Sequence, residues 1–155
     1  MSESLTKIIC GDEIKYFTQF NVGKTITMPC MNINCKNDDI DAIARVKVYT
    51  TKIIDTCEGT SIEGQCLTGK KLIVLGSVNV KLLIPYWYYG SKEGIKDVRI
   101  DFSTFIIIPK EICRNQKVNL RYLLEDVTAK AITSQDIFVS VTVLLQFADE
   151  YIDNV

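Results

Sequence analysis

The feature that most constrains the fold is one long alternating segment, LTGKKLIVLGSVNVKLLIPYW, at residues 67–87. Nearly every even position from 72 to 86 is apolar, which is the period of a β-strand with one buried face. The odd positions mix polar side chains with large apolar ones such as Leu75 and Leu83. A strand of about 15 residues is far longer than the usual 5–6, and its two apolar faces need two separate apolar environments.

Two arrangements supply the second environment. In the first, the strand bends from one sheet into a second sheet, with Gly76 as the candidate kink or bulge. In the second, the odd face packs on another subunit. The sequence leaves both open.

Period-2 alternation also dominates the rest of the chain, which predicts further strands joined by short polar turns. Such a chain favours antiparallel pairing, and we predict an all-β fold, either an antiparallel β-sandwich or a partly open barrel with long bent strands. Residues 1–23 form an N-terminal arm with the first short strand, and residues 24–152 form a single β domain. The predicted strands lie at about 13–20, 24–28, 43–55, 72–86, 98–108, 118–124 and 137–147, with a glycine-punctuated loop at 57–69 and a helical turn at 38–44 that Asp38 or Asp39 could cap.

The size and charge of the chain narrow its class. At 155 residues with a net charge of −1, it fits one globular domain with a core of its own. Its cations are dispersed, so we expect no nucleic acid partner. The N-terminus lacks the pattern of a secretory signal, and no apolar segment is long enough to span a bilayer. We therefore expect a soluble protein made inside the cell, without membrane insertion.

The chain contains no histidine. This removes Ser–His and Cys–His pairs, a histidine general base and imidazole metal ligands. We find no phosphate loop, nucleophile elbow or dinucleotide fingerprint. We therefore expect no enzyme, with no catalytic residues and no cofactor. The acidic NDDID at 37–41 lacks the spacing of a calcium loop, and no metal site is expected.

Six cysteines are many for a chain of this size in a reducing cytosol. Reduced thiols are our first interpretation and disulfides formed after release are the second. A zinc site of Cys30, Cys35, Cys57 and Cys66 comes third, because neither pair has C-x2-C spacing. Cys10 lies near the N-terminus, where it could cross-link to a neighbouring molecule without distorting the fold. The candidate cross-linking residues are Cys10, Cys30, Cys35, Cys57, Cys66 and Cys113.

Two segments are candidate interfaces. The aromatic run PYWYYG at 85–90 places Trp87, Tyr88 and Tyr89 before a turn, where they could anchor a protein, stack on a sugar or pack at a strand end. Near the N-terminus, Ile8 and Ile9 lie in the short apolar run TKIIC. Residues 1–11 are a candidate donor strand, in which one subunit's extended segment completes another subunit's sheet.

Several motifs in fixed order resemble the SPOCS domain, a family named for spore coat and SipL-type proteins of spore-forming bacteria. They are CKNDDIDAIARVKV from Cys35, LTGKKLIV at 67–74, FSTFIIIP at 102–109 and QDIFVSVTVLLQ at 135–146. The likeness covers about residues 24–150. This chain departs from the family pattern at Asn37, where proline is usual, at Leu75, where glutamate is usual, and at WYYG, which replaces a more polar hairpin.

The resemblance implies synthesis in the mother-cell cytoplasm and deposition at the spore surface, and it brings no catalytic residue. Our functional hypothesis is a structural, self-assembling protein of the coat, exosporium or an appendage, joined through strand edges and disulfides. Its partners would be copies of itself and other spore coat proteins. The alternative is a binding module that docks a coat morphogenetic protein or a cell-wall glycan through the aromatic hairpin.

Overall fold

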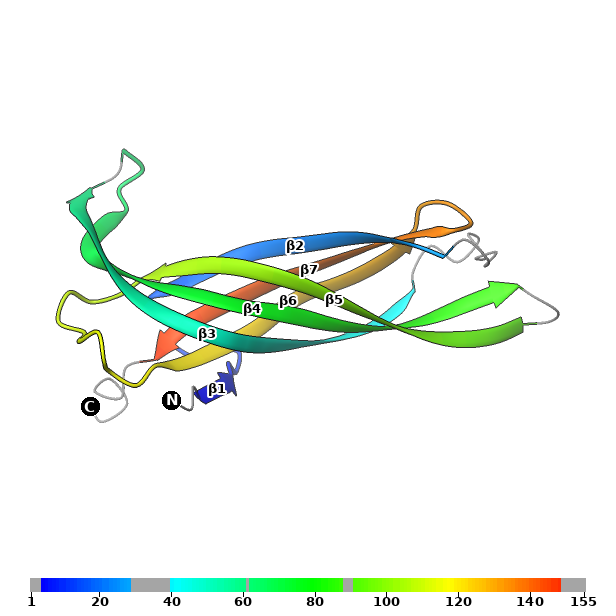
Figure 1. Ribbon diagram of the computed structural model, residues 1–155, viewed down its shortest axis with the longest axis horizontal. Coiled ribbons are helices and arrows are strands. Elements are labelled where there is room, and N and C mark those ends of the chain that lie inside the picture. Colours follow the sequence, from blue (N-terminus) through cyan, green and yellow to red (C-terminus); the bar gives the residue numbers. More distant parts are fainter. Residues whose placement is uncertain (1–3, 29–39, 61, 88–90, 149–155) are drawn as a thin grey trace.

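The computed structural model describes residues 4–28, 40–60, 62–87 and 91–148, and these ranges contain strands and no helix (Figure 1). A four-stranded sheet has the order β1-β6-β7-β2, and a three-stranded sheet has the order β3-β4-β5. The predicted all-β class is confirmed, and the two sheets are consistent with a sandwich that does not close into a barrel. The strands are β1 (Ser4–Lys7), β2 (Phe17–Thr27), β3 (Asp41–Thr60), β4 (Cys66–Trp87), β5 (Ser91–Ile107), β6 (Asn119–Ala131) and β7 (Asp136–Ala148).

The long alternating segment is β4, the central strand of the three-stranded sheet. It pairs with β3 from Thr60↔Cys66 to Asp41↔Leu83, and with β5 from Lys71↔Ile107 to Trp87↔Ser91. The idea that this strand bends into a second sheet is therefore wrong, because both of its edges are occupied by the same two neighbours. Its even positions from 72 to 84 face the core and are buried, while its odd positions from 71 to 83 face outward.

The core lies between the two sheets, where alternate side chains from both inner faces meet. Leu72 and Leu82 of β4, for example, are 0 % exposed, as are Val141 and Leu145 of β7. On one side of the sandwich, Phe20 of β2 packs on Phe102 of β5 with ring centroids 4.8 Å apart. On the other side, β6 packs near β3.

Several strand boundaries differ from those read in the sequence. The two short strands expected at 13–20 and 24–28 are one strand, β2, which pairs with β7 throughout. The helical turn expected at 38–44 is wrong for residues 41–44, which belong to β3. Pairing of Ala42 and Ala44 with β4 outweighs any local helical preference; residues 38 and 39 lie outside the described ranges.

Gly76 lies opposite a bulge, although the extra residue belongs to β3. Val48 pairs with Gly76 and Thr50 pairs with Leu75, which leaves Tyr49 as the inserted residue. A Cβ at Gly76 would lie 2.7 Å from Cζ of Phe102 and closer still to the Lys47 carbonyl oxygen. Position 76 therefore needs glycine for the close approach of a neighbouring backbone.

We expect Gly76→Ala to lower the free energy of unfolding by about 1–3 kcal/mol, because β3 and Phe102 must move to admit the methyl group. Urea denaturation measures the change. Gly59→Ala is the matched control, since a Cβ there meets no atom within 4 Å. Equal stability of the two variants would contradict the close-packing account.

Candidate functional site

The outward face of β3, β4 and β5 is the candidate functional surface, and we call it the outer face. Leu83 and Ile95 are cross-strand neighbours there, and Ile43 lies beside them on β3. Ile43 is 72 % exposed and Ile95 is 74 % exposed. These three side chains, with Lys81, line a hollow of about 550 Å³, which we call the isoleucine hollow. Large apolar side chains held this far into solvent mark a contact surface.

A second apolar group lies further along the outer face, at and just beyond the bulge. Its members are Tyr49, Leu75 and Phe105, each 41–48 % exposed. The Tyr49 hydroxyl donates a hydrogen bond to the hydroxyl of Ser77 at 2.9 Å, and Ser77 is fully buried beneath it. The apolar odd positions of β4 thus belong to an exposed surface shared with its two neighbours.

Cations lie over the aromatic rings of the outer face. The guanidinium of Arg99 is 5.1 Å from the Tyr49 ring centroid, and the ammonium of Lys71 is 4.4 Å from that of Phe105. Arg99 donates a hydrogen bond to Asp101 at 2.8 Å, and this bond raises the pKa of Arg99 above its ordinary value. Among the described side chains of this face, cations outnumber carboxylates: Arg45, Lys47, Lys52, Lys71, Lys81 and Arg99 against Asp41, Asp97 and Asp101.

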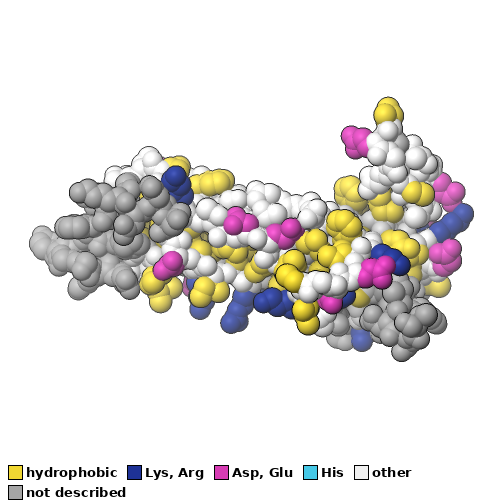
Figure 2. All heavy atoms as spheres, turned by 180° about the vertical axis from the view of Figure 1, so that it is seen from behind, with side chains coloured by type: hydrophobic (Ala, Val, Ile, Leu, Met, Phe, Trp, Pro, Cys, Tyr) yellow, Lys and Arg dark blue, Asp and Glu magenta, His cyan; other side chains and the backbone are white. Residues whose placement is uncertain are grey.

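The outward face of the four-stranded sheet has more uncharged polar side chains, although Phe17 of β2 and Phe138 of β7 are also exposed there. Asn21 of β2 donates to the hydroxyls of Ser140 and Thr142 at 3.0 and 2.9 Å. Gln19 donates to Glu125 of β6 at 2.9 Å. Figure 2, which views the molecule from behind, shows a broad white area of uncharged polar side chains and backbone with carboxylates within it, and hydrophobic side chains beside it. The molecule therefore presents a basic, partly apolar front and a more polar back that carries charges of both signs.

Long sheet edges add to the candidate surface. Within the described chain, β3 and β5 each pair with β4, and β2 pairs with β7. The opposite edge of each of these strands has no strand partner in the described ranges. Edges of this length are sites where another extended chain can add to a sheet.

The predicted donor segment lies on its own chain's sheet. β1 pairs parallel to β6, from Ser4↔Asn119 to Lys7↔Tyr122, and the Ile8 N–H donates to the Tyr122 carbonyl at 2.8 Å. Of the two predicted interface isoleucines, Ile8 is 3 % exposed and Ile9 is 72 % exposed. Ile8 is thus a core anchor in this arrangement, whereas Ile9 remains accessible.

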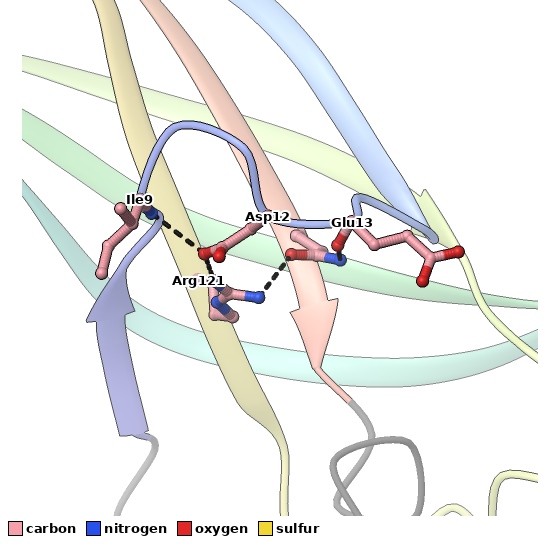
Figure 3. A network of polar contacts seen from close by, with 5 residues as sticks. Ile9, Asp12, Glu13 and Arg121 are labelled. Carbon is pink, nitrogen blue, oxygen red and sulfur yellow. Dashed lines mark hydrogen bonds and ion pairs between the residues drawn. The ribbon is translucent and has the colours of Figure 1, made fainter. Parts of the chain in front are cut away.

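A polar network fixes the chain after β1 against the four-stranded sheet (Figure 3). Asp12 forms an ion pair with Arg121 of β6 and accepts a hydrogen bond from the Ile9 N–H at 3.1 Å. Gln146 of β7 accepts from Arg121 and donates to the Glu13 carbonyl, both at 3.4 Å. We call the Asp12–Arg121 pair the latch; its side chains are 34 % and 24 % exposed.

The four described cysteines are free and exposed. Cys10 lies in the turn closed by the Asp12 N–H and the Ile9 carbonyl, and Cys113 lies in the β5–β6 connection. Cys57 lies at an irregularity of β3, and Cys66 begins β4. Cys30 and Cys35 fall outside the described residues, and with them half of the zinc set considered above. Within the described ranges, no group of three or more metal-ligating side chains was found.

The β5–β6 connection is fixed to the β3–β4 hairpin by charged side chains. Arg114 pairs with Asp55, Lys110 pairs with Glu58 at 2.7 Å, and the Lys70 ammonium donates to the Ile112 carbonyl. The hydrogen bond from Arg114 lowers the pKa of Asp55, and the hydrogen bond to Glu58 raises the pKa of Lys110. Both contacts hold Cys113 near the end of the molecule that carries Cys57 and Cys66.

The predicted aromatic interface is beyond what the structure describes. Trp87 ends β4 opposite Ser91, but its side chain lies outside the described residues, as do Tyr88 and Tyr89 altogether. Sequence reasoning missed the latch. The available signal was a carboxylate after TKIIC and an arginine among the alternating residues of β6, which pair only through the tertiary fold.

Comparisons with known proteins identify no relative. A scan against family models, a search of curated proteins and a search of solved structures each found no match. The described residues also contain no helix that is long and apolar enough to cross a membrane. The resemblance to the SPOCS domain therefore rests on the sequence motifs.

We expect the four described thiols to react in the native protein. The variant with Cys30→Ser and Cys35→Ser should consume four equivalents of an aromatic disulfide reagent without denaturant, because Cys10, Cys57, Cys66 and Cys113 are exposed. Absorbance of the released thiolate counts them. A thiol that reacts only as fast as the protein unfolds would contradict the exposed placement.

We expect Arg114→Gln to raise the pKa of Asp55 toward its ordinary value of 3.8. The carboxylate loses its charged hydrogen-bond donor, and the lowered pKa depends first on that donor. Because the folded pKa is depressed, the contact supports folding above the ordinary pKa and is lost as pH falls through the folded value. Carboxyl carbon NMR titration measures the pKa, with Arg121→Gln as the distant control; an unchanged value in Arg114→Gln would contradict the contact.

Proposed function

We propose that this chain is a structural protein that assembles with copies of itself, and that it does so at the surface of a bacterial spore. The observation that carries the self-assembly is the outer face, where large apolar side chains stand exposed on a three-stranded sheet. Burying one such side chain contributes about 1.5–3 kcal/mol. The proposal assigns a binding role to the protein and no reaction.

Charge favours a contact between unlike faces. Two copies of the basic outer face would repel each other, whereas the back carries charges of both signs, with Glu125, Asp126 and Asp136 beside Arg121 and Lys130. We therefore propose that the front of one copy packs on the back of the next. Such a contact joins two different surfaces, so it gives a fibre or layer when the rotation between copies does not close.

Exposed thiols would then form disulfides between copies that have already assembled. Cys57, Cys66 and Cys113 lie at the end of the molecule where the β3–β4 hairpin meets the β5–β6 connection. Transfer from the reducing cytosol to an oxidising exterior would allow disulfides between neighbouring copies. The location at the spore is proposed from the motif resemblance. The alternative, docking of a coat protein or glycan through Trp87, Tyr88 and Tyr89, stays a prediction.

Negative-stain microscopy and light scattering of the purified chain, with reductant present, test self-assembly directly. Polymers or large oligomers are the expected result. A monomer at all accessible concentrations would overturn the proposal.

We expect the double variant Ile43→Glu with Ile95→Glu to assemble less readily. The concentration at which half of the chains are assembled should rise about tenfold or more. Both substitutions place charges in the isoleucine hollow and leave the core unchanged. Ile62→Glu is the control, because Ile62 is fully exposed in the turn between β3 and β4 and not on the outward face of either sheet. Equal loss in the control, or no loss in the double variant, would show that the outer face is not the contact.

A further inference from the structure

We call residues 4–13, the segment before β2, the arm. The arm contacts β6 and β7, which are distant from it in the sequence, although β2 follows it directly in the chain. β1 pairs with β6, the latch joins Asp12 to Arg121 of β6, and the Glu13 carbonyl accepts from Gln146 of β7. β2, into which the arm leads, lies at the opposite edge of the same sheet. The arm is therefore a separate element that is connected to its own domain by a short link.

That link is strained. Tyr16 has a φ of 55°, a backbone conformation that is uncommon for a residue other than glycine, asparagine or aspartate. Its carbonyl accepts a hydrogen bond from the Phe147 N–H at 2.9 Å, so β7 holds Tyr16 in place while the arm turns away. Strain in a short hinge favours domain swapping, because an arm that extends away relieves it.

The place that the arm occupies is specific for its sequence. Ile8 is buried, Leu5 packs against the core, and Leu120 of β6 is 1 % exposed. The edge of β6 supplies the parallel pairing, and Arg121 supplies a cation matched to Asp12. An arm from another copy brings the same groups and would make the same contacts.

We propose that this arm site on β6 and β7 also accepts the arm of a second copy, with β1 of one copy beside β6 of the next and Asp12 paired with Arg121 of the partner subunit. Exchange replaces each contact with an identical one and relaxes Tyr16, so little opposes it once two copies are close. The inference rests on the proposed self-assembly and names a second contact within it, distinct from the outer face.

Charge reversal separates exchange from closure within one chain. Asp12→Arg alone and Arg121→Asp alone each place like charges in their own latch. When the two variants are mixed, the reversed arm of the first variant meets the reversed sheet of the second, so their charges are again opposite. The native Asp12 of the second variant likewise meets the native Arg121 of the first. The chain carrying both substitutions restores the latch within itself and is the control for folding.

Native mass spectrometry under reducing conditions distinguishes the species by mass. We expect mixed oligomers at roughly tenfold the level of oligomers in either variant alone, and the doubly substituted chain should behave as the native one. We also expect Tyr16→Asn to lower the exchanged fraction of the native chain, because asparagine tolerates the positive φ. Circular dichroism confirms that each variant is folded.

The outcomes separate this inference from the proposed function. A mixture that shows no more association than its components overturns exchange, and if the native chain still polymerises, assembly through the outer face stands. If neither the native chain nor the mixture associates, both proposals fall. Mixed oligomers that still form when Ile43→Glu and Ile95→Glu are added to both variants support exchange as a contact separate from the outer face. If either single variant unfolds, the Tyr16→Asn variant provides the test. An exchanged fraction in Tyr16→Asn that equals the fraction in the native chain would overturn the inference.

Discussion

The pairing of β4 on both edges is the constraint on which the rest of the structure depends. Because β3 and β5 flank it over nearly its whole length, its even face must lie in the core and its odd face must point away. The same register that buries Leu72 and Leu82 exposes Leu75. One pairing therefore sets both the stability of the domain and the composition of its outer face.

The sequence predicted the long strands and the core because period-2 alternation is a local signal, but it did not predict where β2, β3 and β4 begin and end. The even positions of β4 from 72 to 84 and the alternating residues 137–147 of β7 are buried as their pattern indicates. The odd apolar residues of β4 were also visible, but their environment was not, since alternation alone does not say whether a second face meets another sheet or solvent. The bulge at Tyr49 was misplaced onto Gly76 because it arises from the relation of two strands.

The arm site could not be predicted, because each of its parts joins residues far apart in the chain. The parallel pairing of Ser4–Lys7 with β6 has no local signature, and Asp12 and Arg121 are unremarkable until the fold brings them together. Tyr16 likewise gives no sign in the sequence that its backbone is strained. The sheet has more than one edge with which β1 could pair. Contacts with side chains of distant elements, such as Arg121, select the edge of β6.

The length of β4 has a mechanical consequence. The β3–β4 hairpin and the β4–β5 hairpin project at opposite ends of the molecule (Figure 1), so tension applied between the two tips runs along a single strand. A β-strand is already close to full extension, so β4 can lengthen little under that load. The covalent backbone of one strand would then carry the tension from end to end, while β3 and β5 keep that strand straight.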